Sequence, residues 1–149
     1  MKKEELIVKA YSDSHFHLDL CDDPQSLVNG LNDSNVSVVA VTNAPFVYDA
    51  CNSITKDIKN VVTAIGFHPE LALRCHDQIG LFQEKLKQTR FIGEVGLDYF
   101  NKDKKDRTIQ RQVFGAIIDN ANQRGDTVVT VHSRRAASVS YTHLRAHET

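Results

Sequence analysis

Short apolar runs of strand length alternate along the chain with longer segments in which apolar residues recur at helical spacing. The apolar runs are rich in β-branched residues, which is typical of strands buried on both faces. The strands predicted in this way are 11–20, 36–42, 61–65, 91–95 and 127–131. The predicted helices are 24–31, 46–58, 79–86 and 108–123. Strands that alternate with helices predict a parallel α/β fold with right-handed connections.

Two residues are expected to mark the ends of predicted helices. Asp77 stands just before the apolar positions that begin at Ile79, so we expect it to cap that helix. Gly125 follows the last predicted helix, where a glycine at the C-cap position is expected.

Amino-acid composition excludes some classes of protein but does not indicate a reaction. The 149 residues are 41% hydrophobic and 25% charged, which excludes a fibrous or wholly disordered chain. The formal net charge is −1, so a polyanion would have to be bound locally. The chain shows no signal peptide and no membrane span, and its 3 cysteines form no C-x-x-C pair. We therefore expect a cytoplasmic protein with free thiols.

Polar side chains recur at the carboxyl ends of the predicted strands. In the common parallel α/β architectures these ends carry the functional groups. One such group appears in each βα unit, which a random scatter of surface histidines would not produce. The residues are His15, His17, Asn43, His68, Glu94 and His132.

The first of these positions forms an H-x-H pattern. In an extended strand alternate residues share a face, so His15 and His17 point the same way and can hold one cation. Asp13 or Asp19 could orient one of the two rings by accepting its second N–H. A pair of solvated or core-capping histidines would give the same pattern, and the two interpretations stay open at this point.

Glu94 is the most informative single residue. It lies in the apolar run 91–97, where an unpaired carboxylate would cost several kcal/mol. A Lys or Arg partner would solve this, and so would a metal ion shared with His15 and His17. His132 ends the next strand and either completes such a site or only caps the strand.

Four segments together resemble the successive signatures of TatD-type metal-dependent hydrolases. The segments are 13–19 (DSHFHLD), 66–69 (GFHP), 92–99 (IGEVGLDY) and 131–134 (VHSR). The resemblance implies a (β/α)8 TIM barrel and a deoxyribonuclease, often a 3′-to-5′ exonuclease, that depends on magnesium or another divalent ion. It implies that His15 and His17 bind the first of two metals, that Glu94 is shared between them and that His132 binds the second. His68 and Arg134 would then contact substrate, and Asp98 occupies a motif position without an assigned role.

The types of ligand predicted here do not identify the metal. Imidazole ligands favour zinc, manganese or iron, whereas the resemblance implies magnesium, which prefers oxygen. The expected substrate is DNA, with RNA as a possibility. The run 102–107 and Arg111 form a local basic segment that could contact phosphates, although such a run is more often a solvated loop. The sequence shows no stacking platform of aromatic residues beside it.

The length of the chain predicts how much of the barrel is present. An eight-stranded barrel takes about 250 residues, so we expect a barrel truncated after about the fifth strand, with about four and a half βα units. Residues 1–137 would form its amino-terminal part and 138–149 a non-native tail without an apolar period. The metal-binding aspartate of the family would lie past the present C-terminus. The catalytic residue is therefore unknown, and we expect this chain to be weakly active or inactive.

Two other functions are alternatives to a deoxyribonuclease. One is a zinc-dependent amidohydrolase or lactonase, and the other is a non-catalytic metal-binding or partner-binding fragment. The oligomeric state is not predicted.

Overall fold

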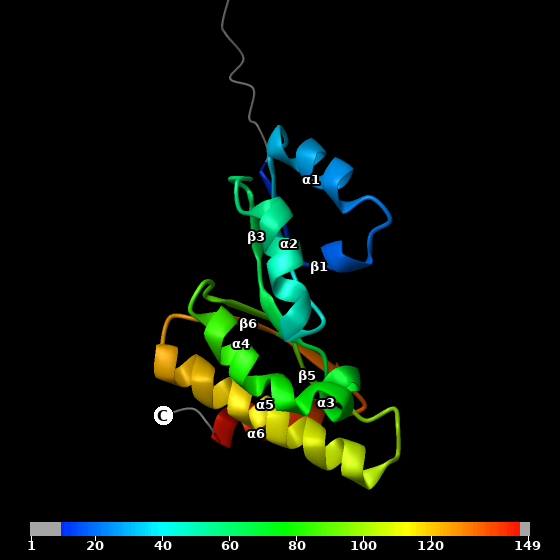
Figure 1. Cartoon of the computed structure of the whole chain (residues 1–149). Coiled ribbons are helices and arrows are strands. Elements are labelled where there is room, and N and C mark those ends of the chain that lie inside the picture. Colours follow the sequence, from blue (N-terminus) through cyan, green and yellow to red (C-terminus); the bar gives the residue numbers. More distant parts are fainter. Residues whose placement is uncertain (1–9, 147–149) are drawn as a thin grey trace, which may run out of the picture.

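A computed structural model describes residues 10–146 and shows parallel strands alternating with helices (Figure 1). The strands are β1 (Tyr11–Phe16), β2 (Val36–Ala40), β3 (Val61–Thr63), β4 (Ile65–Phe67), β5 (Phe91–Asp98) and β6 (Val128–Arg134). The α-helices are α1 (Pro24–Asn32), α2 (Tyr48–Thr55), α3 (Pro69–Cys75), α4 (Ile79–Leu86), α5 (Lys104–Arg124) and α6 (Ala137–Ala146). Short 3-10 helices are η1 (Leu18–Leu20), η2 (Pro45–Val47) and η3 (His76–Gln78).

All strand pairs are parallel, and they form two three-stranded sheets in the orders β1-β2-β3 and β4-β5-β6. The sheets meet where Thr42 pairs with β5. Its N–H donates to the carbonyl oxygen of Gly93 at 3.0 Å, and its own carbonyl accepts from the N–H of Glu94 at 3.1 Å. The predicted parallel α/β class is confirmed, whereas the described residues do not close into a barrel.

Several element boundaries differ from the predictions for local reasons. The predicted strand 61–65 is interrupted at Ala64 and extends to Phe67 as β4. The expected extended stretch 11–20 ends at Phe16, and η1 turns the chain at Leu18–Leu20. Asp77 does not cap α4, because it lies within η3 and Gln78 occupies the N-cap position. The predicted C-cap at Gly125 is confirmed, with φ of 80°.

Two helices were not predicted. Helix α3 begins with Pro69 at its first turn, and the His68 ring nitrogen Nδ1 accepts the N–H of Glu70 at 3.3 Å. Helix α6 occupies the segment in which no apolar period was found, and it packs through the buried Ser140, whose Oγ lies 3.0 Å from Ser133 Oγ. Its sequence holds no Gly or Pro to stop a helix. A non-native origin of 138–149 stays a prediction, and residues 147–149 lie outside the described residues.

The apolar side chains form two separate clusters. The larger cluster, which we call the β4–β6 core, packs α3, α4 and α5 against β4 and β5 and includes Phe67, Phe82 and Phe114. The smaller cluster, the β1–β2 core, contains Leu18, Val28, Ala40 and Cys51. Figure 1 shows α1 and α2 beside the first sheet, and α3, α4 and α5 grouped beside the second. Among the described residues no helix combines the length and the apolar character needed to cross a membrane.

Candidate metal centre

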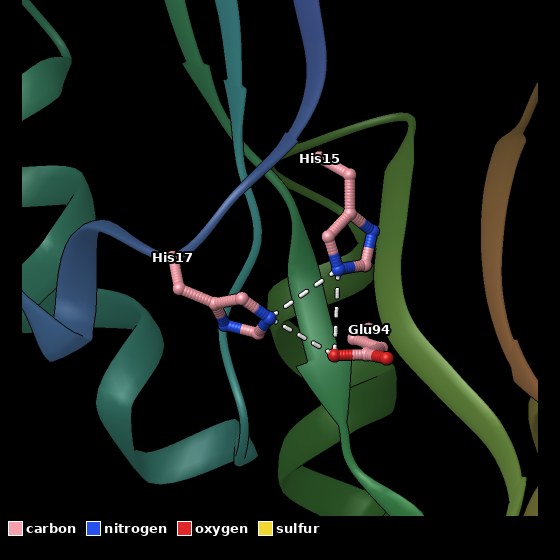
Figure 2. Close-up of side chains that lie close together, drawn as sticks. All are labelled: His15, His17 and Glu94. Atoms are coloured by element: carbon pink, nitrogen blue, oxygen red, sulfur yellow. Dashed lines mark hydrogen bonds and ion pairs between the residues drawn. The ribbon is translucent and has the colours of Figure 1, made fainter. Parts of the chain in front are cut away.

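Three side chains, two from the end of β1 and the residue just after it and one from β5 of the second sheet, converge beside the carboxyl end of β1 (Figure 2). The Nε2 atoms of His15 and His17 lie 3.3 Å apart. The Oε2 atom of Glu94 lies 3.4 Å from the first and 3.1 Å from the second. His15 belongs to β1, His17 follows it directly and Glu94 lies in β5, so the fold joins its two sheets at this point.

This triangle fits a metal ion. Metal–nitrogen and metal–oxygen bonds of about 2.1 Å place neighbouring ligand atoms of a tetrahedral ion roughly 3.4 Å apart, close to the three separations observed. Of the two outer nitrogens, that of His15 has a hydrogen-bond partner and that of His17 has a carboxylate nearby. His15 Nδ1 lies 2.6 Å from Thr130 Oγ1, and His17 Nδ1 lies 3.6 Å from Asp19 Oδ1. Such partners favour a proton on Nδ1, which leaves the Nε2 lone pairs directed at the shared point.

Asp19 is itself held in place. Its Oδ2 atom accepts the side-chain N–H of Asn43 at 2.9 Å and the backbone N–H of the same residue at 3.3 Å. Its other oxygen and His17 Nδ1 are buried without a closer partner. Asp13, the other carboxylate considered for this role, instead accepts the backbone N–H of His15 at 3.0 Å.

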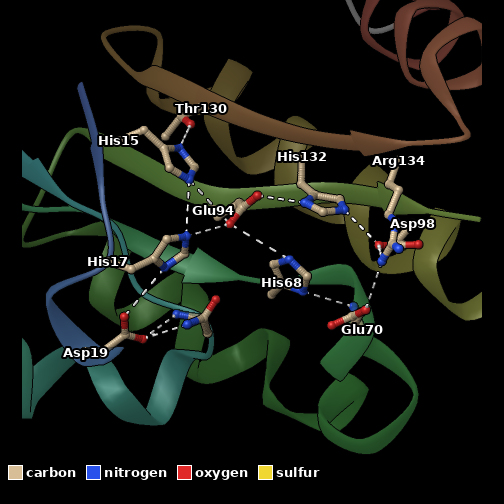
Figure 3. A network of polar contacts seen from close by, with 11 residues as sticks. His15, His17, Asp19, His68, Glu70, Glu94, Asp98, Thr130, His132 and Arg134 are labelled. Carbon is tan, nitrogen blue, oxygen red and sulfur yellow. Dashed lines mark hydrogen bonds and ion pairs between the residues drawn. The ribbon is translucent and has the colours of Figure 1, made fainter. Parts of the chain in front are cut away.

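A second group lies on the other side of the same carboxylate (Figure 3). Glu94 Oε1 is 2.7 Å from His132 Nδ1, and Glu94 Oε2 is 3.8 Å from His68 Nε2. The rings of His68 and His132 meet edge to face with centroids 4.5 Å apart. His68, Glu94 and His132 thus form a second set of side chains that could hold a metal ion, and Glu94 belongs to both sets.

Asp98 continues this network outward. Its Oδ2 atom lies 2.9 Å from His132 Nε2, so His132 stands between two carboxylates. Arg134 Nη1 lies 3.9 Å from the same oxygen and 4.0 Å from Glu70 Oε1. Arg134 therefore borders the network through Asp98 and lies at its solvent side, with half of its side chain exposed.

The network shifts the ionisation of its members. Burial raises the pKa of Glu94, but the hydrogen bond with His132 and the nearby His68 and His15 outweigh this, so its pKa lies below the ordinary value. Burial lowers the pKa of His68 more than Glu94 raises it. A carboxylate that stays charged beside a neutral imidazole is the ionisation state that a metal site needs.

The structure brings together the four residues predicted to bind metal, His15, His17, Glu94 and His132, and it places His68 among them rather than apart. Sequence reasoning missed Thr130. The available signal was its spacing of two from His132 in a predicted strand, which puts both on one face. The basic run 102–107 lies on the loop and first turn that follow β5, where Arg107 donates to the carbonyl oxygens of Asn101 and Tyr99.

Comparisons with known proteins place this geometry in a family. Residues 12–149 match the family described as TatD related DNase. The structure matches the crystal structure of YJJV, a TatD homologue from Escherichia coli K12, with a TM-score of 0.79 and 21% sequence identity. That match covers 92% of this chain and 56% of the other, so the chain spans little more than half of that structure. A search of curated proteins finds no match. Because the family signature extends over nearly the whole sequence, the protein belongs to the family of TatD-related DNases.

Proposed function

We propose that the protein is a divalent-metal-dependent nuclease that cleaves phosphodiester bonds of DNA, as a 3′-to-5′ exonuclease. One observation carries the proposal: Glu94 belongs to two histidine groups, and its Oε2 faces His15 and His17 while its Oε1 faces His132. A carboxylate placed in this way can bridge two cations. Membership of the TatD-related DNase family supports the choice of nucleic acid as substrate.

In this proposal His15 and His17 hold one ion, His132 holds the other and Glu94 is shared. Two bound divalent ions would activate a water molecule and stabilise charge on the reacting phosphodiester. Thr130 and Asp19 keep the two first imidazoles in the tautomer that presents Nε2. Asp98 acts on His132 in the opposite sense, because its carboxylate accepts a hydrogen bond from Nε2–H and leaves Nδ1 facing Glu94.

His68 and Arg134 are proposed to contact the substrate. His68 borders a cavity of about 450 Å³ that His17, Asn43 and Glu94 also line. Arg134 is half-exposed next to Asp98 and presents a guanidinium group with donors that suit a phosphate.

We further propose that this chain corresponds to the amino-terminal part of an eight-stranded barrel and is itself weakly active or inactive. The coverage of 56% of the YJJV chain supports this. A metal-binding aspartate from a later strand, which would serve as the catalytic group, has no counterpart among the assigned site residues. Metal binding is therefore the property to measure first in this chain.

A second candidate function is a zinc-dependent amidohydrolase or lactonase that acts on a small molecule. The donor set favours it, since three or four imidazoles with one carboxylate suit zinc or manganese better than magnesium. Metal analysis of the purified protein, with parallel nuclease and lactone assays in Mg²⁺, Mn²⁺ and Zn²⁺, separates the two candidates.

We also propose a cytoplasmic location. The three cysteines, Cys21, Cys51 and Cys75, are free thiols, as expected in a reducing compartment. Burial raises the pKa of the Cys51 thiol to about 11, which suits a packing role rather than a reactive one.

The decisive test is Glu94→Gln, which keeps the shape of the side chain and removes its charge. We expect loss of Mn²⁺ binding by isothermal titration calorimetry, and loss of any metal-stimulated cleavage of single-stranded DNA. Glu84→Gln is the matched control, because Glu84 is exposed and pairs with Lys85 far from the site. Unchanged Mn²⁺ affinity in Glu94→Gln would refute the bridging role.

A further inference from the structure

An exposed aromatic ring stands at the end of β5 beneath two arginines. Phe100 keeps 52% of its surface exposed. The guanidinium carbon of Arg134 lies 4.1 Å from the ring centroid, and that of Arg135 lies 4.9 Å from it. The half-exposed ring therefore lies in contact with two positively charged groups. We call these three residues the Phe100 platform.

The platform is tied to the candidate metal centre by short contacts. The backbone N–H of Phe100 donates to Asp98 Oδ1 at 2.8 Å, and the other oxygen of Asp98 lies 2.9 Å from His132 Nε2. Arg134 Nη1 lies 3.9 Å from that second oxygen. A single carboxylate thus fixes both the metal-site histidine and the start of the platform, so a ligand on the platform lies beside the metal centre.

The platform has features that a purely structural ring would not need. Phe100 lies outside the residues that make up or pack against the two apolar cores. Arg135 adopts a left-handed backbone conformation with φ of 55°, which is unfavourable for a residue with a side chain. An exposed cation–π pair contributes only about 0.5–1 kcal/mol. Stability alone therefore gives little reason for two arginines over one exposed ring.

The surrounding charge suits a polyanion. Lys102, Lys104 and Lys105 are exposed on the loop and first helical turn that follow Phe100. Asp103 accepts the N–H of Asp106, and Asp106 is buried against Gln110. The segment 102–107 carries four basic and two acidic side chains, so its charge is positive. The chain as a whole carries a net charge of −1, so this concentration of positive charge is local.

We propose that the Phe100 platform binds the strand of a single-stranded nucleic acid next to the scissile phosphate, with a nucleobase stacked on the ring and guanidinium groups. Aromatic and guanidinium faces stack on any base, which gives affinity without sequence preference. The proposal rests on the proposed nuclease function, and it names residues that hold the strand rather than the reacting phosphate. Sequence reasoning found no stacking platform because Arg134 and Phe100 meet only through the pairing of β5 with β6.

The test compares two probes in EDTA, so that no cleavage occurs. Fluorescein-labelled single-stranded DNA of ten thymidines and an abasic strand of the same length are titrated with the protein and followed by fluorescence anisotropy. Wild-type protein should bind the thymidine strand at least about fivefold more tightly than the abasic one. Phe100→Ala should lose most of that ratio, whereas Phe100→Tyr should keep it. Arg134→Ala should reduce the salt dependence of binding by about 0.7 in log–log slope.

The control is another arginine–phenylalanine pair, at the opposite end of β5. Arg90 lies over Phe91 at 5.5 Å, remote from the metal centre, so Arg90→Ala should leave the ratio unchanged. Circular dichroism melts show whether each variant is folded.

Five outcomes are informative. An unchanged ratio in folded Phe100→Ala, or no binding of either strand by wild type, would overturn the platform. A change of oligomeric state in Phe100→Ala without a change in strand binding would make the surface a contact between copies, which also overturns it. Loss of the ratio in Phe100→Ala, together with unchanged Mn²⁺ affinity in Glu94→Gln, would support the platform while the bridging role of Glu94, and with it the nuclease proposal, fails. Loss of Mn²⁺ binding in Glu94→Gln with an unaffected Phe100→Ala ratio would support the metal centre and refute the platform.

Discussion

At the residue scale, the first histidine pair depends on neighbours that fix each ring. Asp19 holds Oδ1 near His17 Nδ1, and Asn43 anchors its other oxygen. Loss of such an outer carboxylate typically weakens metal binding about 10- to 100-fold. We expect Asp19→Asn to lower Mn²⁺ affinity within that range in isothermal titration calorimetry. The exposed Asp22→Asn serves as the control and should bind like wild type. Equal affinities in both variants would exclude the orienting role.

The lowered pKa of Asp98, on the other side of the network, predicts that the stability of the protein depends on pH. Burial raises the pKa of Asp98, but the N–H of Phe100 and the hydrogen bond with His132 outweigh it, so the pKa lies below its usual value of 3.8. Because the unfolded chain then binds more protons, stability rises with pH through this window. The contribution of Asp98 is complete above pH 3.8 and disappears as pH falls through the folded-state pKa.

Urea denaturation of the metal-free protein between pH 2 and pH 6, a range chosen to span this window, tests the sign. Wild type should lose stability on the acid side, and Asp98→Asn should show a smaller loss over the same range. His68 acts in the same direction at higher pH, since burial lowers its pKa and protonation opposes folding. Parallel pH profiles for wild type and Asp98→Asn would contradict the assigned contribution.

At the scale of elements, hydrophobic periodicity was a good guide to strands and long helices. It placed β2, β5, β6 and α5 within a few residues, because each buries a regular face. It missed α3, which is only seven residues long and starts from Pro69 and a cap on His68. Such a helix depends on its cap and its packing on β5 more than on a periodic pattern.

The candidate site was predictable to the extent that it follows strand ends. His15 and His17 lie at the carboxyl end of β1, as expected. Glu94 and His132 lie within their strands, because β5 continues to Asp98 and β6 to Arg134. The contacts of Thr130 with His15 and of Asp98 with His132 depend on how far the strands are shifted relative to one another. That register is a property of the packed sheet, and the sequence pattern does not contain it.

Substitution of two glycines by alanine should change the free energy of unfolding in opposite directions. A Cβ on Gly96, whose φ is 142°, would lie 2.1 Å from the carbonyl oxygen of His132, so β5 and β6 would have to separate. We expect Gly96→Ala to lower the free energy of unfolding by about 1–3 kcal/mol and to weaken metal binding. Gly30 lies inside α1, and a Cβ added there would meet nothing within 4 Å. Gly30→Ala should therefore raise the free energy of unfolding by about 0.5–1 kcal/mol.

Chemical denaturation midpoints, together with Mn²⁺ titrations, check both expectations. The comparison is informative because both substitutions add the same methyl group, and only the surroundings differ. A Gly96→Ala protein as stable as wild type would show that the close approach of β5 to His132 is not needed for the fold.

At the scale of the whole molecule, the two apolar cores differ in size and the candidate metal centre lies between their sheets. The β1–β2 core is small, whereas the β4–β6 core packs three helices on its sheet. Lys85 of α4 also reaches across to Asp49 of α2, with 2.8 Å between Nζ and Oδ2. Thr42 pairs with β5 through its backbone, and Tyr48 of α2 packs in the β4–β6 core. A metal ion held by His15, His17 and Glu94 would add a further link between the two parts.

This arrangement predicts how metal changes local stability. Without metal, the backbone amides of β1 and β2 should exchange with deuterium faster than those of β5, because fewer apolar contacts hold them closed. Opening of β1 removes His15 and His17 from Glu94, so a metal bound to all three must be released first. At a Mn²⁺ concentration about 100 times the dissociation constant, exchange in β1 and β2 should slow about 100-fold. Glu94→Gln should abolish this slowing. If added Mn²⁺ protects β5 and β6 while β1 exchanges as before, the first histidine pair does not bind the ion and the two sheets are not joined through it.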